Sequence, residues 1–286
     1  MAKVVLDGAI DLHCHFGPES VIGTPPAVDA LEAANDAAAL GFGAIVLKSH
    51  DFPSNSVAYV VGQAVDGLRV YGSVCCDFCI GGLNPGAVET ALRDGAAIVW
   101  LPTISSQQDV DNGVAALLGI PGTGIRVLDD DGRLLPEAEE ILALVEQYDA
   151  VAATGHTSTE EHFALARRFA TRGRLVVTHA MNPGAGPALT VSECVELAAL
   201  GAHIELSAAT CMQSHGPSVA DVVHAIGAIG PERVVLSTDY GWSDALPRPA
   251  AGLHSYVDAL WEAGATEAQL RRMVCDNPAR LLRLAG

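Results

Sequence analysis

Eight short apolar runs alternate with segments of helical period along the 286-residue sequence, and this alternation predicts an α/β fold of the (β/α)8 barrel type. Parallel strands need crossover helices, and closing the sheet into a barrel leaves no exposed sheet edge. Polar residues that could carry chemistry end five of the eight runs, as in a barrel with its site at the carboxyl ends of the strands. We therefore expect residues 1–286 to form one barrel domain.

Alanine, valine, leucine and glycine dominate the sequence, with few aromatic residues, a composition typical of an α/β protein whose strands are covered on both faces. A doubly wound open sheet is the structural alternative. No Gly-x-Gly-x-x-Gly turn follows any run, so a dinucleotide site has no support. The runs are Ala9–Phe16, Gly43–His50, Arg69–Asp77, Ala97–Thr103, Ala150–Thr157, Arg174–Asn182, Ala202–Ala208 and Val234–Gly241.

Proline, glycine and capping patterns mark the ends of the predicted helices. Pro25-Pro26 opens a helix over Ala27–Leu40, and Gly41 closes it. Two capping boxes, in which Ser or Thr precedes Glu by three residues, open two further helices. They are Ser158-x-x-Glu161 before Thr159–Arg172 and Thr190-x-x-Glu193 before Val191–Leu200, with Gly173 and Gly201 at the ends.

The connection after the fourth run is irregular. The segment Ile125–Leu135 contains Asp129-Asp130-Asp131-Gly132 and precedes a predicted helix over Pro136–Gln147. A solvated hairpin turn is the favoured interpretation of the acidic stretch, and a metal-binding loop is the alternative.

The charge and cysteine content limit the partners and the compartment. A formal net charge of -18 argues against binding to nucleic acid or to an anionic membrane surface. Seven scattered cysteines fit reduced thiols better than a disulfide framework. For Cys76-x-x-Cys79, burial as small hydrophobic residues is favoured over a zinc or redox role. With no leader or membrane-spanning run, we expect a cytoplasmic protein that acts on a small molecule and forms a homo-oligomer.

The ends of the runs carry the candidate site residues. In the stretch Asp11-Leu12-His13-Cys14-His15, an extended strand places His13 and His15 on one face and Leu12 and Cys14 on the other. The same alternation applies to Lys48 and His50. The other polar run ends are Gly155-His156, Thr178-His179 and Ser237-Thr238-Asp239.

Imidazole and carboxylate groups together suit zinc, manganese or iron in a site that keeps one coordination position for water. Such an ion lowers the pKa of the water, and a neighbouring carboxylate can take its proton. Asp239 is the carboxylate best placed for this role, and His50 is a second catalytic candidate.

The set resembles the metal-dependent amidohydrolase superfamily: His-x-His on strand one, histidines at the ends of strands five and six, and Asp on strand eight. The segment Asp276-Asn277-Pro278-Ala279-Arg280-Leu281-Leu282 is similar to the Asn-Pro-Ala-Arg segment that opens the last helix of those enzymes. The resemblance implies one metal on His13, His15 and Asp239, and a second on His156 and His179. It also implies that Asp239 shuttles the proton.

One departure concerns the fourth strand. Superfamily members with two metals usually carry a bridging carboxylated lysine or a glutamate there, whereas this run ends in Val99-Trp100-Leu101-Pro102-Thr103. Lys48 is a candidate for a relocated, carboxylated bridging ligand, because a lysine buried near cations favours its neutral amine. A lysine that contacts substrate, or that supports the ligands, is the open alternative.

These observations predict a metal-dependent hydrolase that acts on an amide, lactone or ester bond. The alternatives are a one-metal decarboxylase of the same superfamily and a metal-containing binding protein without turnover. Loop residues predicted to contact substrate are His215, after strand seven, and Tyr240 and Arg248, after strand eight; Trp242 could add an aromatic wall. Glu205 is predicted to be buried in the barrel and to need a partner.

Overall fold

The computed structural model describes residues 4–120, 122–213 and 215–284. Its eight strands form one parallel sheet in the order β1 to β8, which confirms the predicted (β/α)8 barrel. All eight apolar runs contain a strand. The strands are β1 (Ile10–His15), β2 (Ala44–Lys48), β3 (Arg69–Cys75), β4 (Ala96–Trp100), β5 (Val151–Ala153), β6 (Arg174–Val177), β7 (His203–Ser207) and β8 (Val234–Ser237).

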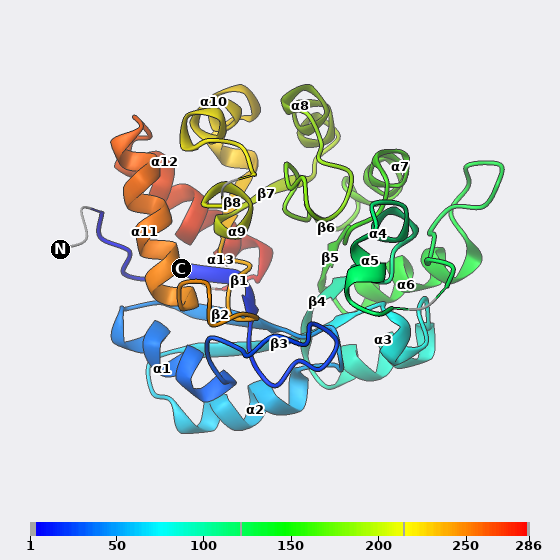
Figure 1. Ribbon diagram of the computed structural model, residues 1–286, viewed down its shortest axis with the longest axis horizontal. Helices are drawn as coiled ribbons and strands as arrows, with labels where there is room; N and C mark the ends of the chain where they lie inside the picture. The colour runs from blue at the N-terminus through cyan, green and yellow to red at the C-terminus, as the bar shows by residue number, and fades with distance from the viewer. Residues whose placement is uncertain (1–3, 121, 214, 285–286) are drawn as a thin grey trace.

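Helices follow the strands and surround the sheet (Figure 1). Within the described part of the chain, none of them has the length and apolar character needed to cross a membrane. The helices are α1 (Ala30–Ala39), α2 (Asn55–Ala64), α3 (Pro85–Arg93), α4 (Gln107–Asp111), α5 (Val114–Leu117), α6 (Pro136–Gln147), α7 (Thr159–Phe169), α8 (Val191–Ala199), α9 (Ala208–Cys211), α10 (Val219–Ile229), α11 (Pro249–Glu262), α12 (Glu267–Arg271) and α13 (Asn277–Leu281), with the 3-10 helices η1 (Phe78–Ile80) and η2 (Pro231–Arg233) and the π-helix η3 (Arg272–Asp276).

The first and last strands meet just beyond the end of β8. The Asp239 amide donates to the His13 carbonyl at 2.8 Å, and the His15 amide donates to the Tyr240 carbonyl at 2.9 Å. Gly241 follows with a φ of 119°, and a Cβ at this position would lie 1.9 Å from the His15 carbonyl oxygen. Only glycine lets the chain pass this close, so closure of the barrel also fixes where Asp239 stands against β1.

Two apolar clusters define the layers of the barrel. One cluster fills the space between the sheet and the helices. The other contains residues from seven strands and from α13, and side chains of that many strands can meet only inside the barrel. Trp100, the last residue of β4, is fully buried in the interior cluster, and its ring centroid lies 4.6 Å from that of His13. Trp100 therefore separates the apolar interior from the polar strand ends.

A break in the register of β1 changes which side chains point inward. The pairing of β1 with β2 shifts between Asp11 and Cys14. Leu12 belongs to the interior cluster and Cys14 to the outer one, so the prediction that these two share a face is wrong. The physical reason is the irregularity itself, since an extra residue resets the alternation of a strand.

The start predicted for the first helix is also wrong. Helix α1 begins at Ala30, because Asp29 caps it: the Asp29 side chain accepts the Glu32 amide, and the Glu32 side chain accepts the Asp29 amide. Pro25-Pro26 lies in the loop before it. The capping boxes at Ser158 and Thr190 are confirmed, although α7 ends at Phe169 and α8 at Ala199, before the predicted Arg172 and Leu200.

The acidic stretch after β4 forms the predicted turn. Leu128 and Leu134 make an antiparallel bridge, and the Asp129 carboxylate accepts the amides of Asp131 and Arg133. Helix α6 has the predicted limits. All seven cysteines are free thiols, but Cys79 is exposed on the turn η1, so the prediction that it is buried is wrong.

Candidate metal centre

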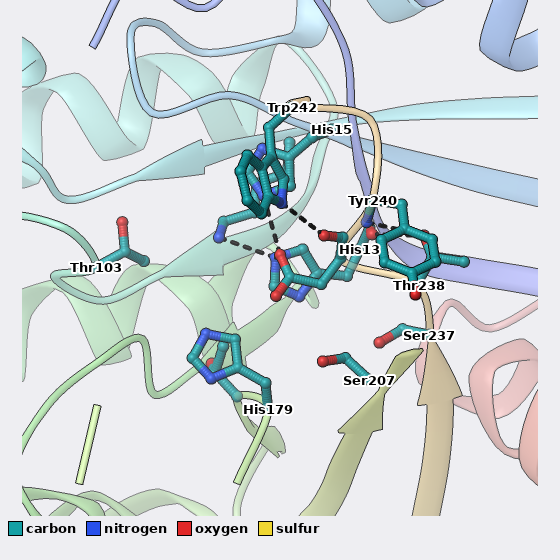
Figure 2. A network of polar contacts seen from close by, with 12 residues as sticks. His13, His15, Thr103, His179, Ser207, Ser237, Thr238, Tyr240 and Trp242 are labelled. Atoms are coloured by element: carbon teal, nitrogen blue, oxygen red, sulfur yellow. Dashed lines mark hydrogen bonds and ion pairs between the residues drawn. The ribbon is translucent and has the colours of Figure 1, made fainter. Parts of the chain in front are cut away.

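Three predicted ligands converge where β1 meets the segment after β8. The Nε2 atoms of His13 and His15 lie 3.0 and 3.3 Å from Oδ1 of Asp239. Figure 2 shows the His13, His15 and His179 rings gathered in one region. Asp239 has a φ of 56°, a left-handed backbone that the closure of the barrel holds in place.

A buried carboxylate stands behind each of the two β1 histidines. Nδ1 of His13 lies 3.0 Å from Oε1 of Glu205 on β7, and Nδ1 of His15 lies 3.0 Å from Oε2 of Glu19. A proton on Nδ1 that is shared with the carboxylate leaves the Nε2 lone pair free. The predicted burial of Glu205 is confirmed, and His13 is its partner. Burial raises the pKa of Glu205 and Glu19, but the neighbouring histidines outweigh it and lower each pKa to about 2.

A second pair of histidines comes from β5 and β6. The Nε2 atoms of His156 and His179 lie 2.9 Å apart. Asp109 on α4 stands behind His156, with Oδ2 2.6 Å from Nδ1. Gly155 sets the position of His156, because its φ is 67° and a Cβ there would lie 2.2 Å from the Leu101 carbonyl oxygen.

Lys48 and His50 extend from the end of β2 into the same region. Nζ of Lys48 lies 2.9 Å from Nε2 of His13 and 4.9 Å from the centroid of the Trp100 ring. Nδ1 of His50 lies 3.2 Å from Oδ2 of Asp77. Burial, together with the charge of Lys48, lowers the pKa of His50 to about 4, so His50 is neutral at pH 7.

The charges of the first cluster favour an ionised Asp239. Burial raises the pKa of this carboxyl, but the charge of His13 and the hydrogen bonds from His13 and His15 hold it well below its usual range. Burial lowers the pKa of His13, but the charges of Asp239 and Glu205 raise it to about 9. In the metal-free protein Nε2 of His13 therefore carries a proton, which a bound ion would displace. Burial and the neighbouring His156 keep the pKa of His179 well below its ordinary value.

A cavity of about 260 Å³ opens above these residues. Its polar floor includes Lys48, His50 and Asp239, and its apolar wall comes from Ile104, Val114 and Leu118. Trp242 also lines it, held by a 2.8 Å hydrogen bond from Nε1 to the Asp239 carbonyl. The other described lining residues are His15, Ile22, His156, His179, Asn182, Gly184, Ala185, Ala209 and Gln213.

The three loop residues predicted to contact substrate are not among the described residues that line this cavity. Tyr240 is buried in the outer core against Gly252 of α11, and in Figure 2 its ring lies away from the histidines. Arg248 pairs at the surface with Asp36, at 2.6 Å. His215 is exposed and is not among the described residues that line the cavity.

Three carboxylates of the site were not predicted: Glu19, Asp77 and Asp109. Asp77 is the last residue of the third apolar run, so it could have been predicted in the same way as the polar residues at the ends of the other runs. Glu19 and Asp109 lie in connections after β1 and β4, where no periodic pattern marks them. Their histidine partners become apparent only in the folded chain.

The donors of the first cluster fit a divalent ion. At a bond length of about 2 Å, two ligands of one ion lie about 3 Å apart, the spacing found between Asp239 and the two β1 imidazoles. Imidazoles with carboxylates behind them are typical of metal sites. His13, His15 and Asp239 form one of the candidate ion-binding groups among the described residues, whereas the assignment of each predicted ligand stays a prediction.

Comparisons with solved structures show the same fold. A 2,6-dihydroxybenzoate decarboxylase from Rhizobium is 14% identical with a TM-score of 0.63, and the alignment covers 98% of this chain and 100% of that one. An amidohydrolase from Burkholderia multivorans is 15% identical with a TM-score of 0.57, covering 97% and 99%. An amidohydrolase from Pseudomonas aeruginosa is 12% identical with a TM-score of 0.56, covering 99% and 96%. The predicted resemblance to amidohydrolases is therefore confirmed at the level of the fold.

Sequence comparisons place the chain more narrowly. A search of curated proteins found no match. One family model matches residues 8–205, which include most of the barrel strands and six of the candidate site residues: His13, His15, Lys48, His50, His156 and His179. Because the match spans more than half of the sequence, the chain belongs to the family of unknown function DUF6282.

Proposed function

We propose that this protein is a metal-dependent hydrolase that cleaves an amide, lactone or ester bond of a small molecule. The observation that carries the proposal is the convergence of His13, His15 and Asp239, with buried carboxylates behind both imidazoles. Zinc is the ion we propose, and manganese or iron suits the same donors.

When bound, a divalent ion supplies Lewis-acid polarisation and lowers the pKa of water. The residues of the chain provide the other requirements. Asp239 is ionised, so it can accept a proton from the attacking water and return it to the leaving group. His50 is neutral, is held by Asp77 and lines the cavity, where it can hydrogen-bond to the substrate.

A decarboxylase is the second candidate, and the end of β4 favours it. Trp100 occupies the strand end at which the resemblance implies a bridging ligand, so nothing on β4 joins two ions. One of the similar structures is a decarboxylase. Such an enzyme would use a single ion on the same three ligands.

The surroundings of Lys48 favour an ammonium over a carbamate. Its Nζ lies over the face of Trp100, and an aromatic face attracts a cation.

The seven free thiols support the proposed cytoplasmic location. A homo-oligomer that acts on a small-molecule substrate completes the proposal.

Metal content and turnover test the proposal together. The protein is reconstituted with zinc, its metal content is measured, and it is incubated with cyclic amides, lactones, acylated amino acids and aromatic carboxylic acids. We expect at least one equivalent of zinc and a hydrolysis product. Release of carbon dioxide with one equivalent of zinc would identify the decarboxylase instead.

Asp239→Asn is the matched variant, because it keeps the shape of the side chain but cannot accept the proton. Turnover should fall by about 10³-fold or more, with the circular dichroism spectrum unchanged. Full activity in this variant, or no metal in the wild type after reconstitution, would contradict the proposed function.

A further inference from the structure

Lys48 is a buried cation without a carboxylate partner. Its side chain is 1% exposed, and Nζ contacts Nε2 of His13 and the face of Trp100. Among the described residues, no carboxylate forms an ion pair with it. A buried ammonium that lacks an anion is costly, because neither water nor a counter-charge compensates it fully.

The cavity is the place from which the missing anion can come. Lys48 lines the cavity floor, and no other lysine or arginine is among the described lining residues. The protein as a whole carries a net charge of -18, which repels anions at long range. The lining also contains the Asp239 carboxylate, which contacts His13 and His15. Lys48 is therefore the one cation among the described lining residues that is left for a ligand anion. One cation beside a carboxylate suits a single negative charge better than a phosphate dianion.

The apolar residues that line the cavity define the rest of the ligand. Ile104, Val114 and Leu118 present aliphatic side chains to the cavity, and the volume of about 260 Å³ admits a compact molecule. We propose that the substrate is a small monocarboxylate with an apolar body, whose carboxylate binds Lys48 and whose body packs on this wall. This inference rests on the proposed function and names the substrate class of the same site.

The position of Lys48 also limits where the reacting bond lies. Nζ stands 2.9 Å from a ligand atom of the candidate metal centre, so a carboxylate on Lys48 is held beside that centre. The bond to be cleaved should therefore lie close to the carboxylate and not at the far end of the apolar body.

Benzoate and benzamide test this inference, because they share one shape and differ in charge. Binding of each is measured by calorimetry to zinc-loaded protein and to protein stripped with a chelator. We expect benzoate to bind at least tenfold more tightly than benzamide in both forms. A preference confined to the zinc-loaded form would mean that the ion, and not Lys48, holds the carboxylate, which would overturn the inference.

Three variants distinguish the loss of the Lys48 charge from a general disturbance of the cavity. Lys48→Met should remove the preference for benzoate but keep the binding of benzamide, whereas Lys48→Arg should keep a preference. Leu118→Ala, the control on the apolar wall, should weaken both ligands equally. If Lys48→Met does not fold, the binding preference of the wild type and of Lys48→Arg for benzoate over benzamide tests the inference.

The outcomes distinguish this inference from the proposed function. Equal binding of the two ligands in zinc-binding wild type overturns the inference alone. A benzoate preference in protein that binds no metal overturns the proposed function alone. Zinc loading that rises with added bicarbonate would identify a carbamate on Lys48, and that result would also overturn the inference.

Discussion

The two halves of the site are built from the same residue types but differ in what completes them. In the half formed by β1 and the end of β8, a carboxylate from Asp239 contacts both imidazoles directly. In the half formed by β5 and β6, the Nε2 atoms of His156 and His179 contact each other, with no carboxylate of the described residues in an ion pair at either atom, and Asp109 stands behind His156.

The difference lies in negative charge at the ligand atoms. The first half has an anion among the donors and can offset much of the charge of a divalent ion by itself. The second half offers two imidazole nitrogens and no carboxylate oxygen at Nε2, so it gains less from an ion and is better suited to share one or to contact substrate. We therefore expect metal affinity to depend mainly on the first half.

The largest effect on metal binding is expected when one histidine of each half is replaced. His15→Gln and His156→Gln each remove an imidazole that has a carboxylate on Nδ1. After reconstitution with zinc and gel filtration, His15→Gln should retain less than about a tenth of an equivalent, whereas His156→Gln should retain most of the metal. Equal losses in both variants would show that the two halves form one site.

The strand-end residues could be predicted because the topology of a barrel leaves little freedom. Parallel strands deliver their last residues to one end, so His13, Lys48, His156 and Asp239 were assigned to one region without coordinates, and they do lie together. Their partners were harder to predict. Glu19 and Asp109 reach the histidines through irregular connections, whose path follows from packing and not from a periodic pattern.

The loop residues Tyr240 and Arg248 lie away from the cavity for a related reason. Tyr240 directly follows Asp239, yet the left-handed backbone at Asp239 and the tight approach of Gly241 turn its ring into the core. Arg248 was predicted as an anion contact, but two acidic residues of α1 lie within reach of it. Neither constraint can be recognised from spacing along the chain.

The next largest effect is a loss of stability when either of two glycines, Gly241 beside Asp239 or Gly155 beside His156, is replaced by alanine. Gly241→Ala places a methyl group against the His15 carbonyl, and Gly155→Ala places one against the Leu101 carbonyl. The left-handed backbone alone costs about 1–2 kcal/mol, and the contacts add to it. The free energy of unfolding in urea should fall by more than that in both variants.

Gly67→Ala is the control for these variants, because Gly67 has a φ of 78° but no atom within 4 Å of the added methyl group. It should show the backbone cost alone. If Gly67→Ala were as destabilising as Gly241→Ala, the close approach at the barrel closure would have no energetic role.

A smaller effect is expected from the carboxylates behind the imidazoles. Glu205 accepts from Nδ1 of His13 and from the backbone amide of His179, so it supports both halves. Glu205→Gln should weaken zinc binding by about 10–100-fold, and Asp109→Asn by much less. Competition with a chromogenic chelator measures both affinities. A stronger effect for Asp109→Asn would reverse the ranking of the two halves.

The smallest effect is a pH dependence behind the second half. His162 on α7 is buried, Nδ1 contacts the Thr157 hydroxyl, and burial lowers its pKa to about 3. The unfolded chain binds a proton at this residue near pH 6.5, whereas the folded chain does not. Stability from neutral His162 is therefore fully present above about pH 6.5 and is lost as the pH falls towards about 3, by up to about 1.4 kcal/mol per pH unit.

His162→Gln removes this titration, so its free energy of unfolding should fall less steeply between about pH 6.5 and about pH 5 than that of the wild type. The two proteins are compared without metal, because bound metal would add its own pH dependence. His224→Gln, at an exposed position of α10, is the control and should follow the wild type. Parallel curves for His162→Gln and the wild type would mean that His162 can take up a proton in the folded protein, and that water reaches its ring.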